Sequence, residues 1–512
     1  MTHPTLTRIE TIVLLAMTGA TFLLHFFINL AGAYGFFRDE LYYIACSEHL
    51  AWGYVDQPPF SIFLLKLSRL ILGDSLTAIR FVPALAHAGT VVITGLLVKE
   101  MNGRVYAISI ACLAVFVSPI DQAMGAFYSM NALDIFLWSL SFYLLLRILT
   151  TENKKYWIAL GVVLGIGLLN KISVLFLGAG IFTGFLLTNR SWFATRWPYV
   201  AGVIAFMCFL PYIVWNLNHD MAHLEFIRNA SEGKYSGRSH LDFITEQLLQ
   251  QNPISLPVWL SGLLAFFIFK PLAKYKLMGW IFITAFLILL LNKTSKGEYM
   301  APAYVSLFAA GGVFLEYQLQ GRFLRWIRYG YPAFLLISFL GLMPLFMPVL
   351  PVEQYLSYAK KIGMEPNSSE NRELAELPQH YADMFGWEEK ARDVASVFKT
   401  LSAEDQTKCA IISSNYGRCG AIDFFGEQYG LPKSIGTHNN YWIWGPRDFS
   451  GEVLIILGGE MEDHIHDFNS VELAGVSTCK YCMPYENNVN IFICRGLKHP
   501  VKDAWAHEKH YD

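Results

Sequence analysis

The sequence has little charge and no excess of basic residues. Only 16% of its 512 residues are charged, and the formal net charge is −2. Because a protein that binds DNA or RNA needs a basic surface to neutralise phosphates, this composition excludes nucleic acid as a partner. The sequence contains no apparent internal repeat, and the glycines within Asn415–Gly426 lack the spacing of a dinucleotide-binding turn.

Long apolar segments dominate the first 350 residues. Hydrophobic residues make up 54% of the chain, and the mean hydropathy is +0.36. Segments of roughly 17–25 apolar residues can cross the hydrocarbon core of a bilayer. We predict about eleven such spans, near residues 11–33, 76–98, 104–120, 132–149, 156–169, 172–188, 198–216, 254–270, 276–292, 299–318 and 329–349. The first is too long for a cleavable signal peptide, so we expect it to remain as a span.

Basic residues follow every even-numbered span, as expected for cytoplasmic loops. They are Lys99 and Arg104; Arg147, Lys154 and Lys155; Arg190 and Arg196; Lys270, Lys274 and Lys276; and Arg322, Arg325 and Arg328. This alternation predicts a cytoplasmic N-terminus, with the loops after odd-numbered spans and everything beyond Met347 facing outward.

The composition changes after residue 350, where the chain becomes polar. Short apolar strands alternate with helix-like runs there, which is typical of an α/β domain. The predicted strands are Cys409–Ser413, Val453–Leu457 and Val489–Cys494, and the predicted helices are Trp387–Leu401, Ala421–Tyr429 and Glu462–Asn469. We therefore predict a membrane domain over residues 1–350 and an extracytoplasmic α/β domain over residues 351–512.

Five of the eight cysteines fall in this second domain. Cys479 and Cys482 form a single CxxC pair, which without a second pair is a weak indication of zinc or redox chemistry. An oxidising exterior favours structural disulfides, so we expect Cys494 to pair with Cys479 or Cys482.

The first outward loop, residues 34–75, concentrates acidic and aromatic side chains. Its core reads RDELYYIACSEHLAWGYVDQPPF over residues 38–60. We expect Asp39–Leu50 to form a short interfacial helix, and Pro58-Pro59 to start a second one over Phe60–Leu72. Such a loop is either a solvated connector or a site of chemistry at the membrane surface.

Other polar residues lie at the outward ends of the predicted spans. Lys171 occupies a tight turn between two short spans, where a lysine needs an anion: a carboxylate in a structural salt bridge, or a lipid phosphate. A carboxylate can take a proton from a sugar hydroxyl, and cations at membrane depth suit a phosphate on a lipid tail. This combination indicates glycosyl transfer from a lipid-phosphate sugar.

The chain resembles the bacterial branch of glycosyltransferase family 39 and the protein O-mannosyltransferase-like proteins, which include the lipid A aminoarabinose transferases. The resemblance extends along nearly the whole chain, and the acidic first loop with its paired prolines is the most specific motif. The other matching stretches are AFYSMNALDIFLW (126–138), GIGLLNKISVLFLG (165–178), KGEYMAPAYVSLFAAG (296–311), NYGRCGAIDFFGEQYGLP (415–432), HNNYWIWGP (438–446) and CMPYENNVNIFICRG (482–496).

This resemblance implies the GT-C fold of the bacterial inner membrane, and transfer with inversion from a polyprenyl-phosphate donor such as undecaprenyl-phosphate sugar. It implies Asp39 as the catalytic residue with Glu40 beside it. Gln57 stands where relatives often carry His or Lys, so the phosphate contacts are expected from Lys171, Arg80 and Lys296. The other expected contacts are Tyr42, Tyr43, Tyr54, Asp56, Gln57, Asn131 and Tyr299 for substrate, and Asp56, His219 and His223 for a possible divalent metal ion.

Two other functional classes fit the residues alone. A transporter would also carry polar groups in its spans, although it usually shows internal repeats. A membrane-anchored binding protein would use the outward domain and could dispense with the first loop. The sequence does not identify the acceptor, which can be an envelope glycolipid such as lipid A, a glycan, or a protein hydroxyl.

Overall fold

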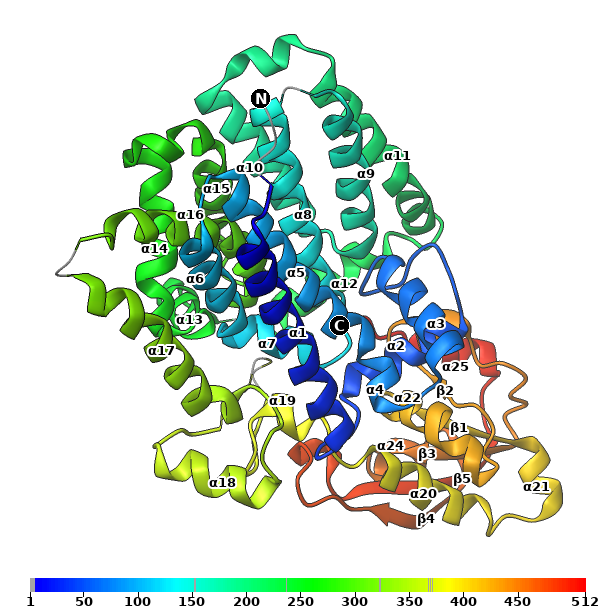
Figure 1. The fold of residues 1–512 in the computed structure, drawn as a ribbon. Coiled ribbons are helices and arrows are strands. Elements are labelled where there is room, and N and C mark those ends of the chain that lie inside the picture. The colour runs from blue at the N-terminus through cyan, green and yellow to red at the C-terminus, as the bar shows by residue number, and fades with distance from the viewer. Residues whose placement is uncertain are drawn as a thin grey trace.

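The computed structural model describes residues 5–151, 153–235, 237–321, 324–366, 368, 370 and 372–512. Arg322, one of the basic residues used to orient the spans, lies outside the described residues. Helices fill the N-terminal two-thirds of the chain, and a small sheet lies beside one end of them (Figure 1).

Each predicted apolar segment contains a helix. These helices are α1 (Arg8–Ala31), α5 (Phe81–Glu100), α6 (Val105–Phe116), α7 (Pro119–Ala126), α8 (Met130–Thr151), α9 (Lys155–Asn170), α10 (Val174–Thr188), α11 (Trp197–Leu217), α14 (Leu256–Ile268), α15 (Lys276–Leu291), α16 (Ala301–Gln318) and α17 (Arg325–Leu342). In the described residues six helices are long and apolar enough to cross a bilayer, or up to eight if each bent pair is one span. The chain is a multi-pass membrane protein, but the count of eleven is not confirmed.

Two bends between consecutive helices explain part of the difference between the predicted and the observed number of spans. Helices α6 and α7 meet at 60°, where Pro119 begins the second helix, and α13 (His240–Gln250) meets the segment Pro253–Ile268 at 85°. A proline lacks the backbone N–H that would continue the preceding helix. The α9 and α10 helices are apolar but shorter than the usual span.

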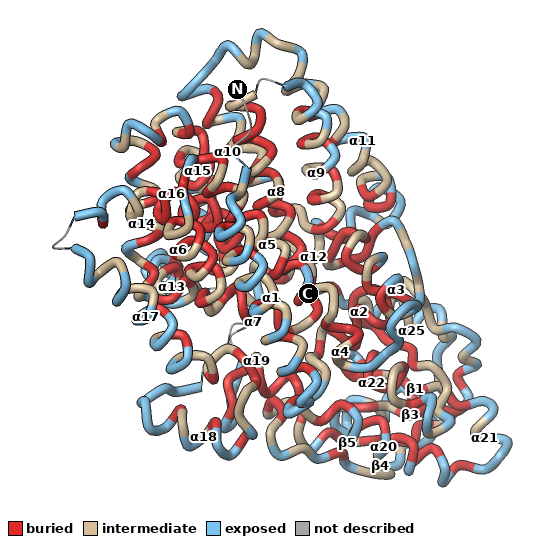
Figure 2. The backbone as a smooth tube through the Cα atoms, in the orientation of Figure 1, coloured by how far each residue is buried: buried red, intermediate tan, exposed pale blue. Residues whose placement is uncertain are grey.

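The helices differ strongly in burial (Figure 2). In the most apolar 18-residue stretch of α8, 78% is buried, whereas in that of the helical segment Arg325–Leu345 only 11% is buried. The main apolar core lies among α5, α6, α8, α14, α15 and α16. Apolar side chains that remain exposed on α1, α11 and α17 suit contact with lipid tails.

The predicted first outward loop, residues 34–75, forms α2 (Arg38–Glu48) and α3 (Phe60–Leu72), and α4 (Leu76–Ile79) follows it. The predicted second helix, Phe60–Leu72, has the bounds of α3. The predicted first helix, Asp39–Leu50, is present as α2, and most of α2 is buried. It packs on α22 (Tyr416–Phe425) so closely that a Cβ on Gly420 would lie 2.8 Å from the Leu41 carbonyl carbon.

The C-terminal sheet contains β1 (Cys409–Ser413), β2 (Ile435–Gly436), β3 (Val453–Leu457), β4 (Phe468–Ser477) and β5 (Val489–Leu497). The strand order is β2-β1-β3-β5-β4. Strands β1, β2 and β3 are parallel, whereas β5 is antiparallel to both β3 and β4.

The three predicted strands lie within β1, β3 and β5, but the predicted helix Glu462–Asn469 is wrong. Only α24 (Met461–His464) is helical there, and β4 begins at Phe468.

The remaining helices connect these parts. They are α12 (Ala222–Glu232), α18 (Val352–Lys361), α19 (Gln379–Ala382), α20 (Trp387–Phe398), α21 (Ala403–Lys408), α23 (Asn440–Trp444) and α25 (Val501–His507), together with 3₁₀ turns at Arg190–Ala194, Pro253–Ser255, Lys270–Tyr275, Gly297–Met300, Met343–Leu345, Gly426–Tyr429 and Pro484–Glu486.

All eight cysteines are free, so the predicted disulfide to Cys494 is not formed. Cys494 is buried in β5, opposite Leu454 of β3 and Val471 of β4. Cys482 instead lies beside its neighbour in the CxxC pair, and its thiol donates to the Cys479 carbonyl at 3.3 Å.

Candidate functional site

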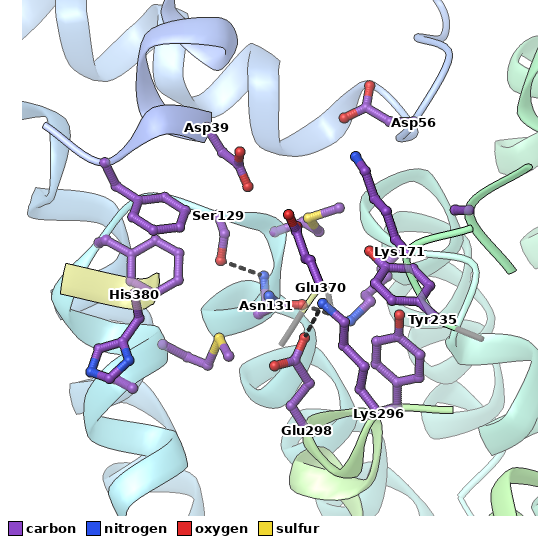
Figure 3. A pocket seen from close by; sticks show the side chains of 18 of the residues that line it. Asp39, Asp56, Ser129, Asn131, Lys171, Tyr235, Lys296, Glu298, Glu370 and His380 are labelled. Carbon is purple, nitrogen blue, oxygen red and sulfur yellow. Dashed lines mark hydrogen bonds and ion pairs between the residues drawn. The ribbon is translucent and has the colours of Figure 1, made fainter. Parts of the chain in front are cut away.

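A cavity of about 560 Å³ lies between one end of the membrane helices and the C-terminal part of the chain. The start of α2, the turns near residues 130 and 171, α12 and the segment 292–299 line it from the N-terminal side. Glu370, Asp383, Tyr416 and Asp512 line it from the C-terminal side. Figure 3 shows Asp39 and Asp56 reaching the cavity from one side, with Lys171, Lys296 and Glu370 directed toward the same space.

Asp39 lies in the first turn of α2 and is held from two directions. Its Oδ1 accepts a hydrogen bond from the Tyr416 hydroxyl at 2.9 Å and another from Arg38 Nε at 3.1 Å. The Asp39 side chain keeps 28% of its surface exposed, whereas that of Arg38 keeps 7%. The carboxylate is therefore oriented by buried groups but remains accessible from the cavity.

Arg38 connects the start of α2 to the C-terminal part. Its guanidinium pairs with Glu370 at 3.1 Å and Asp383 at 3.8 Å, and donates to the Tyr485 hydroxyl at 3.1 Å. Burial alone would raise the pKa of Glu370, but nearby cations, Arg38 foremost, hold it well below its usual range. Glu370 is therefore an anion that fixes Arg38 behind Asp39.

Two lysines reach the cavity from the membrane helices and their loops. Lys171 donates to Asn131 Oδ1 at 2.6 Å and lies 4.9 Å from the ring centre of Tyr299. Lys296 lies 4.0 Å from Glu298 and 4.4 Å from the ring centre of Tyr235. The hydrogen-bond partner of Lys171 is thus an amide, not the carboxylate of a structural salt bridge.

Asp56 reaches the same cavity from the loop before α3. It accepts a hydrogen bond from the Tyr42 hydroxyl at 2.9 Å. Burial raises the pKa of Asp56 to about 7, and the Tyr42 hydrogen bond offsets only part of that rise. The lining also includes Tyr43 and His223.

Glu40 and Arg80 do not line the cavity, contrary to the roles predicted for them. They form a fully buried ion pair with two contacts of 2.8 Å, and Glu40 also accepts from the backbone N–H of Tyr128 at 2.7 Å. Successive residues of a helix point about 100° apart. Asp39 can therefore face the cavity while Glu40 faces the helix packing.

Three predicted substrate contacts are also buried behind the cavity wall. The Tyr42 hydroxyl bonds Asp56 and Asn440, and the Tyr54 hydroxyl donates to the Cys46 carbonyl at 3.2 Å. Gln57 is fully buried, and its side chain has no hydrogen-bond partner in the described part of the chain. These residues shape the wall of the cavity, and the structure does not place them in its lining.

The predicted metal ligands Asp56, His219 and His223 do not converge into a group of three among the described residues. His223 Nδ1 lies 2.9 Å from the Val55 carbonyl oxygen, and His219 stacks on Trp215 with ring centres 4.1 Å apart. Of the three, Asp56 and His223 line the cavity.

Sequence reasoning missed the residues that the C-terminal part contributes. Tyr416, Glu370 and Asp512 line the cavity although they lie more than 300 positions after Asp39. Tyr416 falls in a stretch that supports the family resemblance, but no spacing rule joins it to the first loop. Lys234 and Tyr235 follow α12 and are two further lining residues.

Comparisons with known proteins agree with this architecture. Residues 56–215 match the family described as dolichyl-phosphate-mannose-protein mannosyltransferase. The chain is 26% identical over 302 residues to lipid A galacturonosyltransferase RgtD of Rhizobium johnstonii, an alignment that covers 57% of this chain and 61% of that protein. The chain therefore matches less than two-thirds of this relative's length.

Similar solved structures extend the likeness to nearly the whole chain. ArnT from Cupriavidus metallidurans superposes with a TM-score of 0.62 at 13% identity, covering 94% of this chain and 97% of ArnT, in the apo state. The crystal structure of ArnT bound to undecaprenyl phosphate gives the same values. The chain thus has the GT-C fold of ArnT, and part of it is similar in sequence to the mannosyltransferase family model and to RgtD.

Proposed function

We propose that this protein transfers a sugar from a polyprenyl-phosphate donor to an acceptor hydroxyl at the outer face of the bacterial inner membrane. One observation carries the proposal: a single cavity brings the accessible Asp39 carboxylate together with the Lys171 and Lys296 amines. The related ArnT has been crystallised with undecaprenyl phosphate, which supports a donor of this kind. The name of the relative RgtD supports an envelope glycolipid such as lipid A as acceptor.

In the proposed reaction Asp39 acts as general base. It takes the proton of the acceptor hydroxyl while the hydroxyl oxygen forms a bond to the anomeric carbon. The bond from that carbon to the phosphate oxygen breaks on the opposite face, so the configuration inverts. Polyprenyl phosphate leaves with the electron pair, and the two lysines stabilise its charge.

The orientation of the chain is part of this proposal. The basic loops after the even-numbered predicted spans favour a cytoplasmic N-terminus. Asp39 and the C-terminal α/β part, residues 351–512, then lie on the extracytoplasmic side. A donor carried by a long lipid would reach the cavity from the bilayer, and the acceptor would approach from the aqueous side.

A strain that lacks the gene, complemented with variants of the chain, tests the proposal. Mass spectrometry of envelope lipids and glycans should reveal a sugar that is absent without the protein and restored by the wild type. Asp39→Asn should lower transfer about 10²–10⁴-fold, the usual range for a lost general base. Glu48→Gln, an exposed exchange in the same helix, should restore the sugar. Near-normal transfer by a stably produced Asp39→Asn protein would remove Asp39 from the mechanism.

A further inference from the structure

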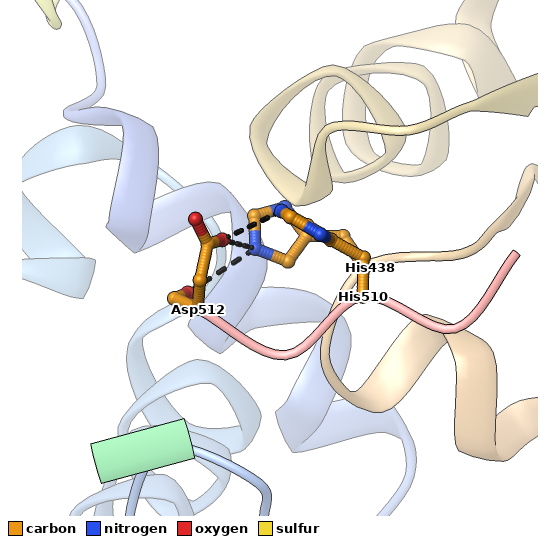
Figure 4. A group of neighbouring side chains, drawn as sticks. All are labelled: His438, His510 and Asp512. Carbon is orange, nitrogen blue, oxygen red and sulfur yellow. Dashed lines mark hydrogen bonds and ion pairs between the residues drawn. The ribbon is translucent and has the colours of Figure 1, made fainter. Parts of the chain in front are cut away.

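Two histidines and an aspartate converge at the edge of the cavity (Figure 4). His438 follows β2, while His510 and Asp512 follow α25. The backbones at His438 and His510 pair as an isolated parallel bridge, secured by a 2.8 Å hydrogen bond from Asn439 N to the His510 carbonyl. This bridge brings the two imidazoles together, with ring centres 4.7 Å apart.

The polar atoms of the three side chains are unusually close. Asp512 Oδ1 lies 2.8 Å from His438 Nε2 and 2.9 Å from His510 Nε2. Both separations are as short as hydrogen bonds, and His438 Nε2 also lies 3.2 Å from the Asp512 main-chain oxygen. Two imidazole nitrogens and a carboxylate oxygen that all lie within 4.8 Å of one another also have the arrangement of ligands around a shared ion.

We propose that His438, His510 and Asp512 form a binding site for a divalent transition metal such as zinc. Zinc binds imidazole nitrogens at about 2.0–2.1 Å and carboxylate oxygens at about 2.0–2.2 Å. Tetrahedral ligands at these bond lengths lie roughly 3.3 Å apart, so a small outward shift of the side chains accommodates the ion. Two imidazoles argue against Mg²⁺ and Ca²⁺, which prefer oxygen ligands.

The site opens toward two cavities. All three residues line a second cavity of about 220 Å³, whose wall also carries Arg372 and Arg418, and Asp512 lines the main cavity as well. Three protein ligands leave a coordination position for water or an anionic oxygen. Lys234 Nζ, 3.7 Å from Asp512 Oδ1, is the nearest cation and would have to move aside. The site is separate from the predicted set Asp56, His219 and His223, and it does not depend on sugar transfer.

Metal content of the full-length protein in detergent tests this site directly. After loading with Zn²⁺ and removal of free ion, the wild type should retain about one zinc per chain. His510→Gln and Asp512→Asn should each weaken retention at least tenfold, because each removes one of three ligands. His499→Gln is the matched control, since this histidine lies in the same part of the chain, is 62% exposed and lies outside the cluster.

Co²⁺ provides a second readout that is independent of activity. Its visible absorption bands should appear with the wild type and with His499→Gln, and they should be lost in His510→Gln. Because the His510 side chain is half-exposed and lies outside the core, this variant should still fold. Excess Mg²⁺ should not displace the bound ion. The proposal would be overturned if the wild type retained no zinc after loading, or if His510→Gln retained as much zinc as the wild type. Either result would leave the proposed sugar transfer untouched.

Discussion

Lys171 and Asp39, on two sides of the main cavity, are held in different ways. Lys171 is held by the Asn131 amide and the Tyr299 ring, which are neutral, whereas Lys296 beside it in the lining lies 4.0 Å from the Glu298 carboxylate. On the side of α2, Asp39 is held by the guanidinium of Arg38 and the hydroxyl of Tyr416. Lys171 therefore keeps a charge that an incoming anion can neutralise, whereas Asp39 is already oriented before any substrate binds.

This difference suggests a division of tasks. The neutral partners of Lys171 leave its charge available to a phosphate, so Lys171 should govern donor binding. Oriented hydrogen bonds to a carboxylate fix the direction in which it can take a proton, so the Asp39 side should govern turnover. Variants on the two sides should separate in KM and kcat, and a lysine variant that changed only kcat would contradict this comparison.

Beyond the loss expected for Asp39→Asn, the largest effect should come from Glu40→Gln, and it should be one of stability. Glu40 and Arg80 are both buried, and breaking such a pair typically costs about 3–5 kcal/mol. Thermal unfolding in detergent should show a large loss for Glu40→Gln and little change for the exposed Glu48→Gln. If Glu40→Gln kept wild-type stability but lost transfer, the assignment of Glu40 to packing would be wrong.

The next effect concerns the lysine side. Lys171→Met keeps the length of the side chain but removes a charged hydrogen-bond donor worth about 1.5–3 kcal/mol. The donor KM should therefore rise about tenfold to a hundredfold, with a smaller change in kcat. Steady-state release of polyprenyl phosphate from a synthetic donor measures both constants.

Lys274→Met provides the control for that measurement. Lys274 lies in the predicted cytoplasmic loop after α14, outside the lining of the cavity. Its variant should keep the wild-type KM for the donor. An equal rise in both variants would mean that the effect follows the net charge of the protein and not the position of Lys171.

A smaller effect is expected on the Asp39 side from Tyr416→Phe. This exchange removes the 2.9 Å hydrogen bond to Asp39 and keeps the ring, which packs 4.8 Å from the Tyr42 ring. A lost hydrogen bond to a charged group costs about 1.5–3 kcal/mol at most, so kcat should fall about tenfold with the donor KM unchanged.

Tyr429→Phe is the control for this exchange, since Tyr429 lies in the same part of the chain but outside the cavity lining. Its kcat should match the wild type. A wild-type kcat for Tyr416→Phe would reduce Tyr416 to a packing residue.

Local signals predicted much of the fold. The bounds of α3 follow from the Pro58-Pro59 break and the glycine at position 73, and β1 and β3 are apolar runs of strand length. Strand β4 escaped prediction because it lies at the sheet edge, where most of its residues are at least partly exposed and no apolar run marks it. The number of spans could not be predicted from the length of the apolar segments, because some of these segments form bent helix pairs and others form helices shorter than a usual span.

The site residues could be predicted from the sequence only where a local pattern marked them. Lys171, Lys296 and Asn131 were identified because polar residues at the outward ends of apolar segments stand out. Tyr416 and Glu370 depend on how the C-terminal part docks, which no local pattern encodes. Glu40 was misplaced because adjacency to Asp39 in sequence does not imply adjacency in direction on a helix.

The smallest effect should distinguish Asp56 from Asp39 on the carboxylate side. Burial raises the pKa of Asp56 to about 7, from 3.8 in an exposed setting. Between pH 3.8 and pH 7 the folded protein keeps a proton on Asp56 that the unfolded chain has lost. The contribution of Asp56 to stability therefore falls as the pH rises toward 7 and stays low above it.

The Asp56→Asn side chain cannot ionise and still accepts a hydrogen bond from Tyr42. This variant should melt a few degrees above the wild type at pH 8, with this advantage shrinking toward pH 5, whereas the exposed Asp448→Asn should show no such dependence. A variant less stable than the wild type at pH 8 would mean that the anionic form of Asp56 stabilises the fold, and the contrast with a neutral Asp56 would fail.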